Sequence, residues 1–354
     1  MGKNQHYVPQ FYLKQFSNDN RSIGTWAANI NKIIPHASIS NMASKANLYG
    51  KDQIIEKSLA AEERKWSIIL HRINEAESID SFEDFFDLLD FIMISNSRTL
   101  KMAERVNYMN EFFAKLMLNG RIPEEEIKQM NFEEEIPNLI PMQVAIENTP
   151  ILYDLDWILL ENKTPASFIT TDNPVCLYNP LYIARKYDRN YGMGAGGLVI
   201  LISLSGEKCL CLYDPMVYQC GENNVIQIKS SSSATEINKL LIRNAYQNIF
   251  FNNKQKESYI KSLVKHYVSS PKEQCIKVHM GGNLIQYGGD SIHDYFKLDF
   301  LKIKQEYMEM ELPIHMGGLS RPLAEQKYRE HGDPEPISNE MWKEIAKQFG
   351  REIK

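Results

Sequence analysis

The stretch LVILISLSGEKCLCLY, residues 198–213, decides the fold class of this chain. It contains two apolar runs, at residues 198–203 and 208–213, with Leu-Ser-Gly-Glu between them. Short apolar runs bounded by glycine and serine are typical of buried strands, and so short a connection favours antiparallel pairing. The stretch therefore predicts a β-hairpin in the core.

Similar runs lie before and after this hairpin along the chain. Residues 156–161 and 167–171 come before it, and residues 225–229 come after it. Apolar residues then recur at helical spacing in residues 234–248 and 256–268, which predicts two helices that cover the strands. Together these segments predict a central, mainly antiparallel sheet over about residues 151–270.

A helical block precedes this sheet, at about residues 42–150. Apolar residues recur in steps of three and four from residue 55 to 73, and further helices are expected after an N-cap at Ser81 and over residues 100–118. Two short strands, at residues 23–30 and 32–38, come first. The chain is therefore expected to have an α+β fold, with the N-terminal helical block packed on the central sheet.

The sequence pattern changes after residue 270. Pairs of glycines punctuate it, and Asp-Pro-Glu-Pro at residues 333–336 resembles a linker before a last helix at residues 338–349. We expect a main domain at residues 1–270 and a small, peripheral C-terminal extension at residues 271–354.

The composition narrows the classes of protein. The 354 residues carry a formal net charge of -5, so contact with nucleic acid would need a local basic patch. No apolar run approaches the ~20 residues that span a bilayer, and the polar start of the chain lacks the apolar stretch of a secretory signal. We therefore expect a cytoplasmic protein without a membrane partner, and the sequence predicts no oligomeric state.

The five cysteines favour reduced thiols in the core over disulfides or metal. Cys209 and Cys211 alternate along an apolar run, so both face the same side of a strand. A zinc site made of these two with Cys176 and Cys220 is the alternative, but no CxxC pair supports it.

Two stretches together resemble a known family. The chain opens with HYVPQFYLKQF at residues 6–16 and carries FITTDNPV at residues 168–175. They resemble a family of domains of unknown function typified by HYVPQFYLKxF at the extreme N-terminus and by Thr/Ser-Asp-Asn-Pro-Val in mid-chain. The resemblance covers roughly residues 4–250, and it departs from the family at Leu100, where the family has a proline.

This resemblance implies an α+β fold without an assigned mechanism. It also implies membership of a group that bacteria and mobile elements encode, some of whose members are linked to defence against phage. We therefore expect a bacterial anti-phage defence effector, an association that gives no chemistry by itself.

His6 and Asp172 are the first candidates for catalysis. A neutral imidazole titrates near working pH, so His6 suits a general base or metal ligand; the alternative is a partly buried histidine bonded to a backbone carbonyl. Asp172 follows a strand, and a strand end is a rigid position for a catalytic or metal-binding carboxylate. The alternative is an Asx-turn, in which Asp172 bonds its own downstream amides.

A glutamate and an arginine complete the catalytic set. Glu62 or Glu63 is expected to point inward towards Arg98, at the end of the next helix. Such a pair is either a structural tie or part of a site in which the planar guanidinium binds phosphate. Substrate contacts are expected at Gln10, Tyr12, Tyr49, Asn173 and Asn238.

These residue types occur in hydrolases that act on phosphodiesters. Two carboxylates and an imidazole would hold Mg²⁺ or Mn²⁺, with Asp172 as a ligand, while Arg98 stabilises the developing charge. The leading hypothesis is therefore a metal-dependent nuclease that acts on nucleic acid. It requires that the opening segment folds back onto the loop after residue 171, because the candidates come from distant segments.

Two other functions stay open. One is a non-catalytic sensor whose aromatic N-terminal motif binds a phage protein or a nucleic-acid end. The other is an ADP-ribosyltransferase-like enzyme that uses His6, Tyr49 and a glutamate. The loop GMGAGG at residues 192–197 resembles a phosphate loop, but a strand follows it where a dinucleotide loop opens a helix, so we expect a flexible loop bordering the site.

Overall fold

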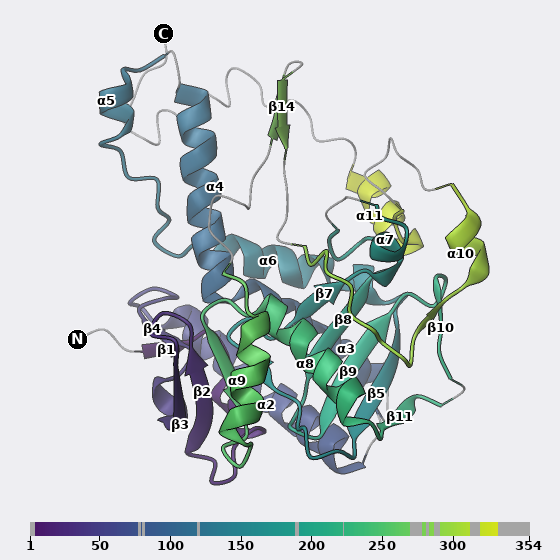
Figure 1. The fold of residues 1–354 in the computed structure, drawn as a ribbon. Helices are drawn as coiled ribbons and strands as arrows, with labels where there is room; N and C mark the ends of the chain where they lie inside the picture. The colour runs from purple at the N-terminus through teal and green to yellow at the C-terminus, as the bar shows by residue number, and fades with distance from the viewer. Residues whose placement is uncertain are drawn as a thin grey trace.

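The computed structural model describes residues 4–76, 79, 82–118, 121–187, 191–221, 223–269, 278–280, 283–286, 291–311 and 319–331. Figure 1 shows the course of the chain, with the N-terminal strands beside the helices and a larger sheet across the body. Ser81, Cys275 and the helix predicted at residues 338–349 lie outside the described residues.

The predicted α+β class is confirmed. The larger sheet has the strand order β11-β5-β9-β8-β7. β11 (Val225–Ile228) is parallel to β5 (Asp156–Asn162), and the other neighbours, β9 (Lys208–Tyr213), β8 (Val199–Ser203) and β7 (Cys176–Tyr178), are antiparallel. The hairpin predicted from residues 198–213 is therefore present as β8 and β9.

Both faces of this larger sheet are covered. Every residue of β8 and β9 is buried, which explains why their sequence is a continuous apolar run rather than an alternation. Figure 1 shows α8 (Ser231–Asn244) in front of the sheet, and α2 (Ile54–Ala76) and α3 (Phe82–Ser97) behind it. The ammonium of Lys208 in β9 donates to the carbonyl of Ile73 near the end of α2, over 3.3 Å.

A smaller antiparallel sheet has the order β3-β2-β12-β6. β2 (Ser22–Ala27) and β3 (Lys32–Ser38) form the predicted N-terminal hairpin. β12 (Asn248–Phe251) joins this hairpin to β6 (Thr170–Thr171), which follows the hairpin by more than 130 residues in the chain. The N-terminal segment therefore packs beside the middle of the chain.

The strand predicted at residues 167–171 is wrong in its length and in its partners. Only Thr170 and Thr171 are extended in a ladder, and they belong to the smaller sheet. The preceding amide of Ile169 donates to the side chain of Asn238 instead of a strand, over 3.1 Å. Local pattern cannot reveal this, because the competing acceptor comes from α8.

The helix predicted at residues 234–248 runs as α8, and its last part was misassigned. α8 starts at an N-cap, Ser230, and is followed by Ala245, whose ψ of 144° is extended. The amides of Tyr246 and Gln247 then donate to the carboxylate of Asp172, so a buried acceptor holds the chain in an extended form. The next residues form β12.

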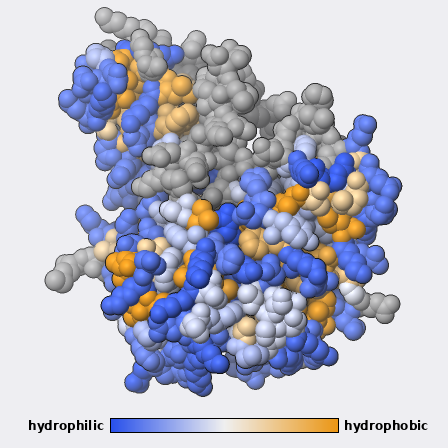
Figure 2. Space-filling view, in the orientation of Figure 1, coloured by the Kyte–Doolittle hydropathy of each residue, from blue (hydrophilic) through white to orange (hydrophobic). Residues whose placement is uncertain are grey.

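The predicted helices of the N-terminal block are confirmed as α2, α3 and α4 (Leu100–Leu118). Figure 1 shows α4 and the short α5 (Glu124–Ile127) above the body, and Figure 2 shows apolar side chains on this arm. The remaining elements of this region are β1 (Asn4–His6), α1 (Gln10–Lys14), η1 (Ile39–Asn41), β4 (Ser44–Ala46), α6 (Leu139–Asn148) and η2 (Thr149–Leu152).

Short elements complete the second half of the described chain. They are α7 (Pro180–Ala184), β10 (Tyr218–Gln219), α9 (Glu257–Leu263), η3 (Val264–His266), β13 (Val278–Met280), β14 (Asn283–Gln286), β15 (Lys302–Ile303), α10 (Gln305–Glu309) and α11 (Pro322–His331). The helix predicted at residues 256–268 corresponds to α9 and η3.

The C-terminal residues that the structure describes contact the main body. β15 pairs with β10, and Phe296 and Leu298 are buried in the core. Arg321 is also buried and forms an ion pair with Asp154. The predicted boundary near residue 270 stays a prediction, and the described parts of the extension contribute to the same core.

The glycine loop at residues 192–197 receives this C-terminal segment. The amide of Gly196 donates to the carbonyl of Leu319 over 2.5 Å, and Tyr182 bonds the backbone of Leu319 through its hydroxyl. A Cβ on Gly196 would lie 2.6 Å from the Leu319 side chain, so the close approach requires glycine. The loop therefore packs against the backbone of Leu319 from the same chain.

No helix among the described residues combines the length and the apolar character needed to cross a membrane.

Candidate functional site

The N-terminal motif is positioned by a two-stranded ladder. β1 pairs with β4, which places His6 opposite Ser44 and directly before the turn into α1. Gln5 is buried between them, where its side chain accepts from the amide of Tyr49 at 2.6 Å and donates to the carbonyl of Gly50 at 3.0 Å. The buried glutamine therefore fixes the segment around Tyr49 against the start of the chain.

Arg98 joins this segment to the helices. Its guanidinium donates to Glu63 Oε1 at 2.7 Å, to the carbonyl of His6 at 2.6 Å and to the Tyr49 hydroxyl at 3.2 Å. The Tyr49 hydroxyl in turn donates to the Arg98 carbonyl at 3.1 Å. We call Gln5, His6, Tyr49, Glu63 and Arg98 the N-terminal clasp.

The clasp resolves which glutamate faces the arginine. Glu63 is the partner of Arg98, whereas Glu62 is exposed on α2. The Arg98 side chain is 2% exposed and that of Glu63 is 25% exposed. The arginine is therefore sealed, and only the carboxylate side of the pair meets solvent.

The surroundings keep Arg98 charged and Tyr49 neutral. Burial alone would lower the pKa of Arg98, but Tyr49 and Glu63 outweigh it and hold this pKa above its usual value. Burial raises the pKa of Tyr49, so its hydroxyl stays protonated and can donate. Removing either charge would leave the other in a poorly solvated position.

The ring of His6 is engaged at both nitrogens. Its Nε2 lies 3.1 Å from the carbonyl of Ser40, and its Nδ1 lies 3.4 Å from Nε2 of the Gln10 side chain. Burial lowers the pKa of His6, and the bond to Ser40 partly opposes this shift. We assign the neutral tautomer in which Nε2–H donates to Ser40 and Nδ1 accepts from Gln10. This geometry is that of a histidine bonded to a backbone carbonyl, and a catalytic role for it stays a prediction.

Asp172 directly follows β6 and bonds the backbone at the start of β12. Its carboxylate accepts from the amides of Tyr246, Gln247 and Asn248 at 2.8–2.9 Å, and from the Asn248 side chain at 3.3 Å. Burial raises its pKa to about 6, and the bonds from these amides partly oppose the shift. The carboxylate oxygens of Asp172 therefore bond amides more than 70 residues further along the chain. This differs from the Asx-turn that was the alternative, in which they would bond the amides directly after Asp172.

The remaining predicted contact residues lie inside the protein. The Tyr12 hydroxyl contacts Thr170 Oγ1 at 2.8 Å and donates to the Ser203 carbonyl at 2.6 Å, which links α1 to both sheets. Asn238 accepts from the Ile169 amide and donates to the Ser167 carbonyl at 2.9 Å. All of these contacts are structural bonds between elements.

Asn173 also bonds within the fold. Its side chain donates to the carbonyl of Asn244, at the end of α8, over 3.0 Å. Asn244 returns a bond of 2.7 Å to the carbonyl of Asn173. These two reciprocal hydrogen bonds connect the loop after β6 to the end of α8.

The structure therefore brings part of the predicted set together. His6, Gln10, Tyr49, Glu63 and Arg98 form one cluster, and the Tyr12–Thr170 contact shows the opening segment folded back onto β6. Tyr7 is 4% exposed; burial raises its pKa, and the nearby Asp172 and Tyr49 raise it further. The Asp172 carboxylate instead bonds the amides of residues 246–248, Glu62 is exposed on α2, and Asn238 bonds the backbone of Ser167 and Ile169.

A metal site is a separate question. Within the residues that the structure describes, no group of three or more His, Cys, Asp or Glu side chains is arranged to hold an ion. Cys176, Cys209 and Cys211 are buried free thiols; burial raises the pKa of Cys209 to about 12. Mg²⁺ or Mn²⁺ at Asp172 stays a prediction.

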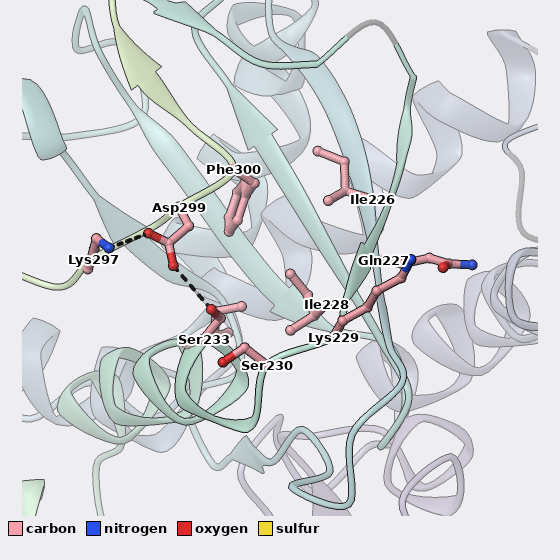
Figure 3. Close-up of a pocket in the computed structure, with 10 residues that line it drawn as sticks. Ile226, Gln227, Ile228, Lys229, Ser230, Ser233, Lys297, Asp299 and Phe300 are labelled. Atoms are coloured by element: carbon pink, nitrogen blue, oxygen red, sulfur yellow. Dashed lines mark hydrogen bonds and ion pairs between the residues drawn. The ribbon is translucent and has the colours of Figure 1, made fainter.

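An open groove lies on another part of the molecule and was not predicted. It has a volume of about 290 Å³. One wall consists of residues 226–229, from β11 and the residue that follows it, and a second wall consists of Ser230, Ser233 and Ile237 at and after the N-cap of α8. The third wall consists of Lys297, Asp299 and Phe300. Figure 3 shows Ile226 and Ile228 directed to the same side as Phe300, while Gln227 points away. We call this the β11 groove. Its third wall comes from a segment about 60 residues further along the chain, so no local motif marks it.

The comparisons with known proteins give a family without an assigned activity. No curated protein and no solved structure matches the chain. A family model described as "Protein of unknown function (DUF4238)" matches residues 4–255, a span that holds the N-terminal clasp, Asp172 and both sheets. Because this match covers well over half of the 354 residues, the chain belongs to the DUF4238 family.

Proposed function

We infer that this protein acts by recognition: it binds a macromolecular partner, and the residues that resemble a catalytic set serve the fold. A role as a sensor in bacterial anti-phage defence, in the cytoplasm, is part of this proposal. The resemblance of the two motifs at residues 6–16 and 168–175 supports that role.

The observation that carries the proposal is that the polar groups of His6, Arg98 and Asp172 form hydrogen bonds with other groups of the protein itself. Both ring nitrogens of His6 have protein partners, and the guanidinium of Arg98 bonds three groups while 2% exposed. The Asp172 carboxylate accepts four bonds. A general base must reach the proton that it removes, and a phosphate-binding arginine must reach the phosphate.

The β11 groove is a second observation that supports recognition. It is open, it combines apolar walls with lysine and serine side chains, and its strand lies at the edge of a sheet. Such surfaces are used for binding segments of other chains. No residue of the candidate catalytic set lines this groove.

The nuclease hypothesis keeps one observation in its favour. His6, Glu63 and Arg98, chosen from three distant segments, do meet in one cluster. A nuclease or an ADP-ribosyltransferase would need the clasp to open, so that the guanidinium exchanges its bonds to His6 and Tyr49 for bonds to a phosphate.

A cleavage assay tests the proposal. Purified protein would be incubated with supercoiled plasmid, total RNA or NAD⁺, with Mg²⁺, with Mn²⁺ and with chelator, beside His6→Gln and Asp172→Asn. We expect no cleavage and no NAD⁺ consumption above the level of the variants. Metal-dependent cleavage that His6→Gln abolishes, while this variant still unfolds cooperatively, would show that the clasp is catalytic.

A further inference from the structure

The β11 groove lies along a sheet edge that is open for pairing. β11 is the last strand of the larger sheet, with β5 as its neighbour in the ladder. Gln227 and Lys229 are exposed, and Val225 and Ile226 are half-buried. An unpaired edge presents a row of amides and carbonyls that another extended chain can use.

The direction of these backbone groups follows from two hydrogen bonds between β5 and the chain of β11. The amide of Leu159 donates to the carbonyl of Asn224 at 2.7 Å, and that of Lys163 donates to the carbonyl of Ile228 at 3.0 Å. Backbone groups of successive strand residues alternate between the two edges. The amides and carbonyls of Val225 and Gln227 therefore point away from β5, into solvent.

Two other edge strands, β3 and β7, have features that β11 lacks. β3 contains Pro35, which has no amide hydrogen to donate. At the opposite end of the larger sheet, a described segment lies against β7, because the Tyr178 hydroxyl accepts from the amide of Phe296 at 2.7 Å. β11 has neither a proline nor a described segment across its edge.

The side chains beside this edge define what would bind. Ile226, Ile228 and Phe300 form the apolar part of the groove. Lys297 pairs with Asp299 at 2.7 Å, so these two charges offset each other. Lys229 forms no ion pair with a described residue, and it lies at the positive end of the α8 dipole, beside the N-cap Ser230. Among the charged side chains that line the groove, Lys229 therefore remains as one unbalanced positive charge, which favours an anionic group.

We propose that β11 binds an extended acidic peptide segment of a partner protein as an additional strand. Amides and carbonyls of the peptide pair with those of Val225 and Gln227, and alternate side chains enter the β11 groove. Apolar side chains lie on Ile226 and Phe300, and an acidic side chain lies beside Lys229. This inference rests on the proposed recognition function and names the class of partner.

Labelled peptides test the proposal on the full chain. The probe is Thr-Glu-Thr-Val-Thr-Val-Thr-Glu-Thr, which places glutamate beside Lys229 in either strand direction. We expect a saturable rise in fluorescence anisotropy, and at least about tenfold weaker binding when lysine replaces both glutamates. Two further probes carry N-methyl groups, one at its odd-numbered residues and the other at its even-numbered residues. Only one of these two sets of amides faces β11, so one methylated peptide should not bind and the other should bind nearly as well as the unmodified probe.

Two variants of the protein complete the test. Gln227→Pro removes one outward amide and should weaken the probe about tenfold. Lys229→Glu should weaken the acidic probe and strengthen the lysine version, whereas Lys261→Glu, on the exposed face of α9, should change neither.

Several results would overturn the proposal. These are no saturable binding at the highest soluble protein concentration, equal effects of the two N-methylated sets, or binding unchanged by Gln227→Pro. A single-stranded oligonucleotide that binds through Lys229 and is indifferent to Gln227→Pro would assign the groove to nucleic acid. A dimer that Gln227→Pro dissociates would assign it to a second copy. Each of these leaves the cleavage assay, and thus the recognition function, to be judged separately.

Discussion

The N-terminal clasp and the β11 groove are opposite in almost every physical respect. The clasp is built from the most distinctive sequence of the chain, and its polar groups are buried and bonded to one another. The groove is built from ordinary residues, and its polar groups face solvent. Buried polar networks specify a fold when every member is satisfied, whereas unsatisfied exposed groups are available to a partner. Under the proposed function, the distinctive motif therefore stabilises the architecture and the binding site lies elsewhere.

The difference has a direct consequence for mutagenesis. Substitutions in the clasp should change the free energy of unfolding, and substitutions in the groove should change binding while stability stays nearly constant. The four predictions that follow run from the largest expected effect on stability to the smallest.

Arg98→Met should cost about 3–5 kcal/mol of unfolding free energy, because it leaves Glu63, the His6 carbonyl and the Tyr49 hydroxyl without their buried donor. Urea denaturation at neutral pH measures it. The control is Lys65→Met, which breaks the more exposed pair with Asp87 and should cost less than about 1 kcal/mol. Equal losses for the two variants would mean that the clasp contributes no more than a surface ion pair.

Asp172→Asn should change the pH dependence of stability. The pKa of Asp172 is raised to about 6 from an ordinary value of 3.8, so the unfolded chain loses this proton first as the pH rises. The wild-type protein should therefore lose up to about 3 kcal/mol relative to the variant between pH 4 and pH 7.

Unfolding free energies of both proteins across this range measure the gap. Asp299→Asn, a change at an exposed carboxylate, should show a nearly constant gap. A wild-type protein that gains stability relative to Asp172→Asn over the same range would mean that the amides of residues 246–248 lower this pKa more than burial raises it.

Gly196→Ala should cost about 2 kcal/mol, because the new methyl group would collide with Leu319 and displace the segment that carries Arg321. It should also speed proteolysis of the C-terminal segment that begins at Leu319. Gly192→Ala is the matched control, since a Cβ at that position meets nothing within 4 Å. Identical stability of the two variants would show that the loop does not hold the C-terminal segment.

Gln227→Pro should change the unfolding free energy by less than about 0.5 kcal/mol, because the amide that it removes points away from the ladder. Ile226→Pro should cost about 3 kcal/mol, because its amide faces β5. Thermal unfolding of the two variants checks this alternation. A large loss at residue 227 and a small one at 226 would reverse the assignment of the outer edge.

The sequence predicted the parts of the fold that depend on local pattern. The period of the apolar residues located α2, α3, α4, the two hairpins and β5. It could not predict that β6 and β12 pair across the chain, since the bonds that stop α8 come from Asp172, more than 70 residues away. Long-range acceptors override local helix propensity in this way.

The composition of the candidate site was partly predicted, and the catalytic role of its residues stays a prediction. The pairing of a glutamate with Arg98 was anticipated, and the structure assigns it to Glu63. Nothing in the sequence indicated that the His6 carbonyl, rather than its ring, would receive the guanidinium. The β11 groove could not be predicted, because Lys297 and Phe300 reach β11 only through the path of the folded chain.

Amide hydrogen exchange, with and without the acidic probe peptide, tests the contrast between the two regions most directly. The amides of Val225 and Gln227 should exchange rapidly in the free protein and become protected when the peptide is added, while the amides of Tyr49 and Arg98 stay protected throughout. Protection that appears around His6 and Tyr49, with no change at Val225 and Gln227, would contradict this assignment and place the binding site at the N-terminal clasp.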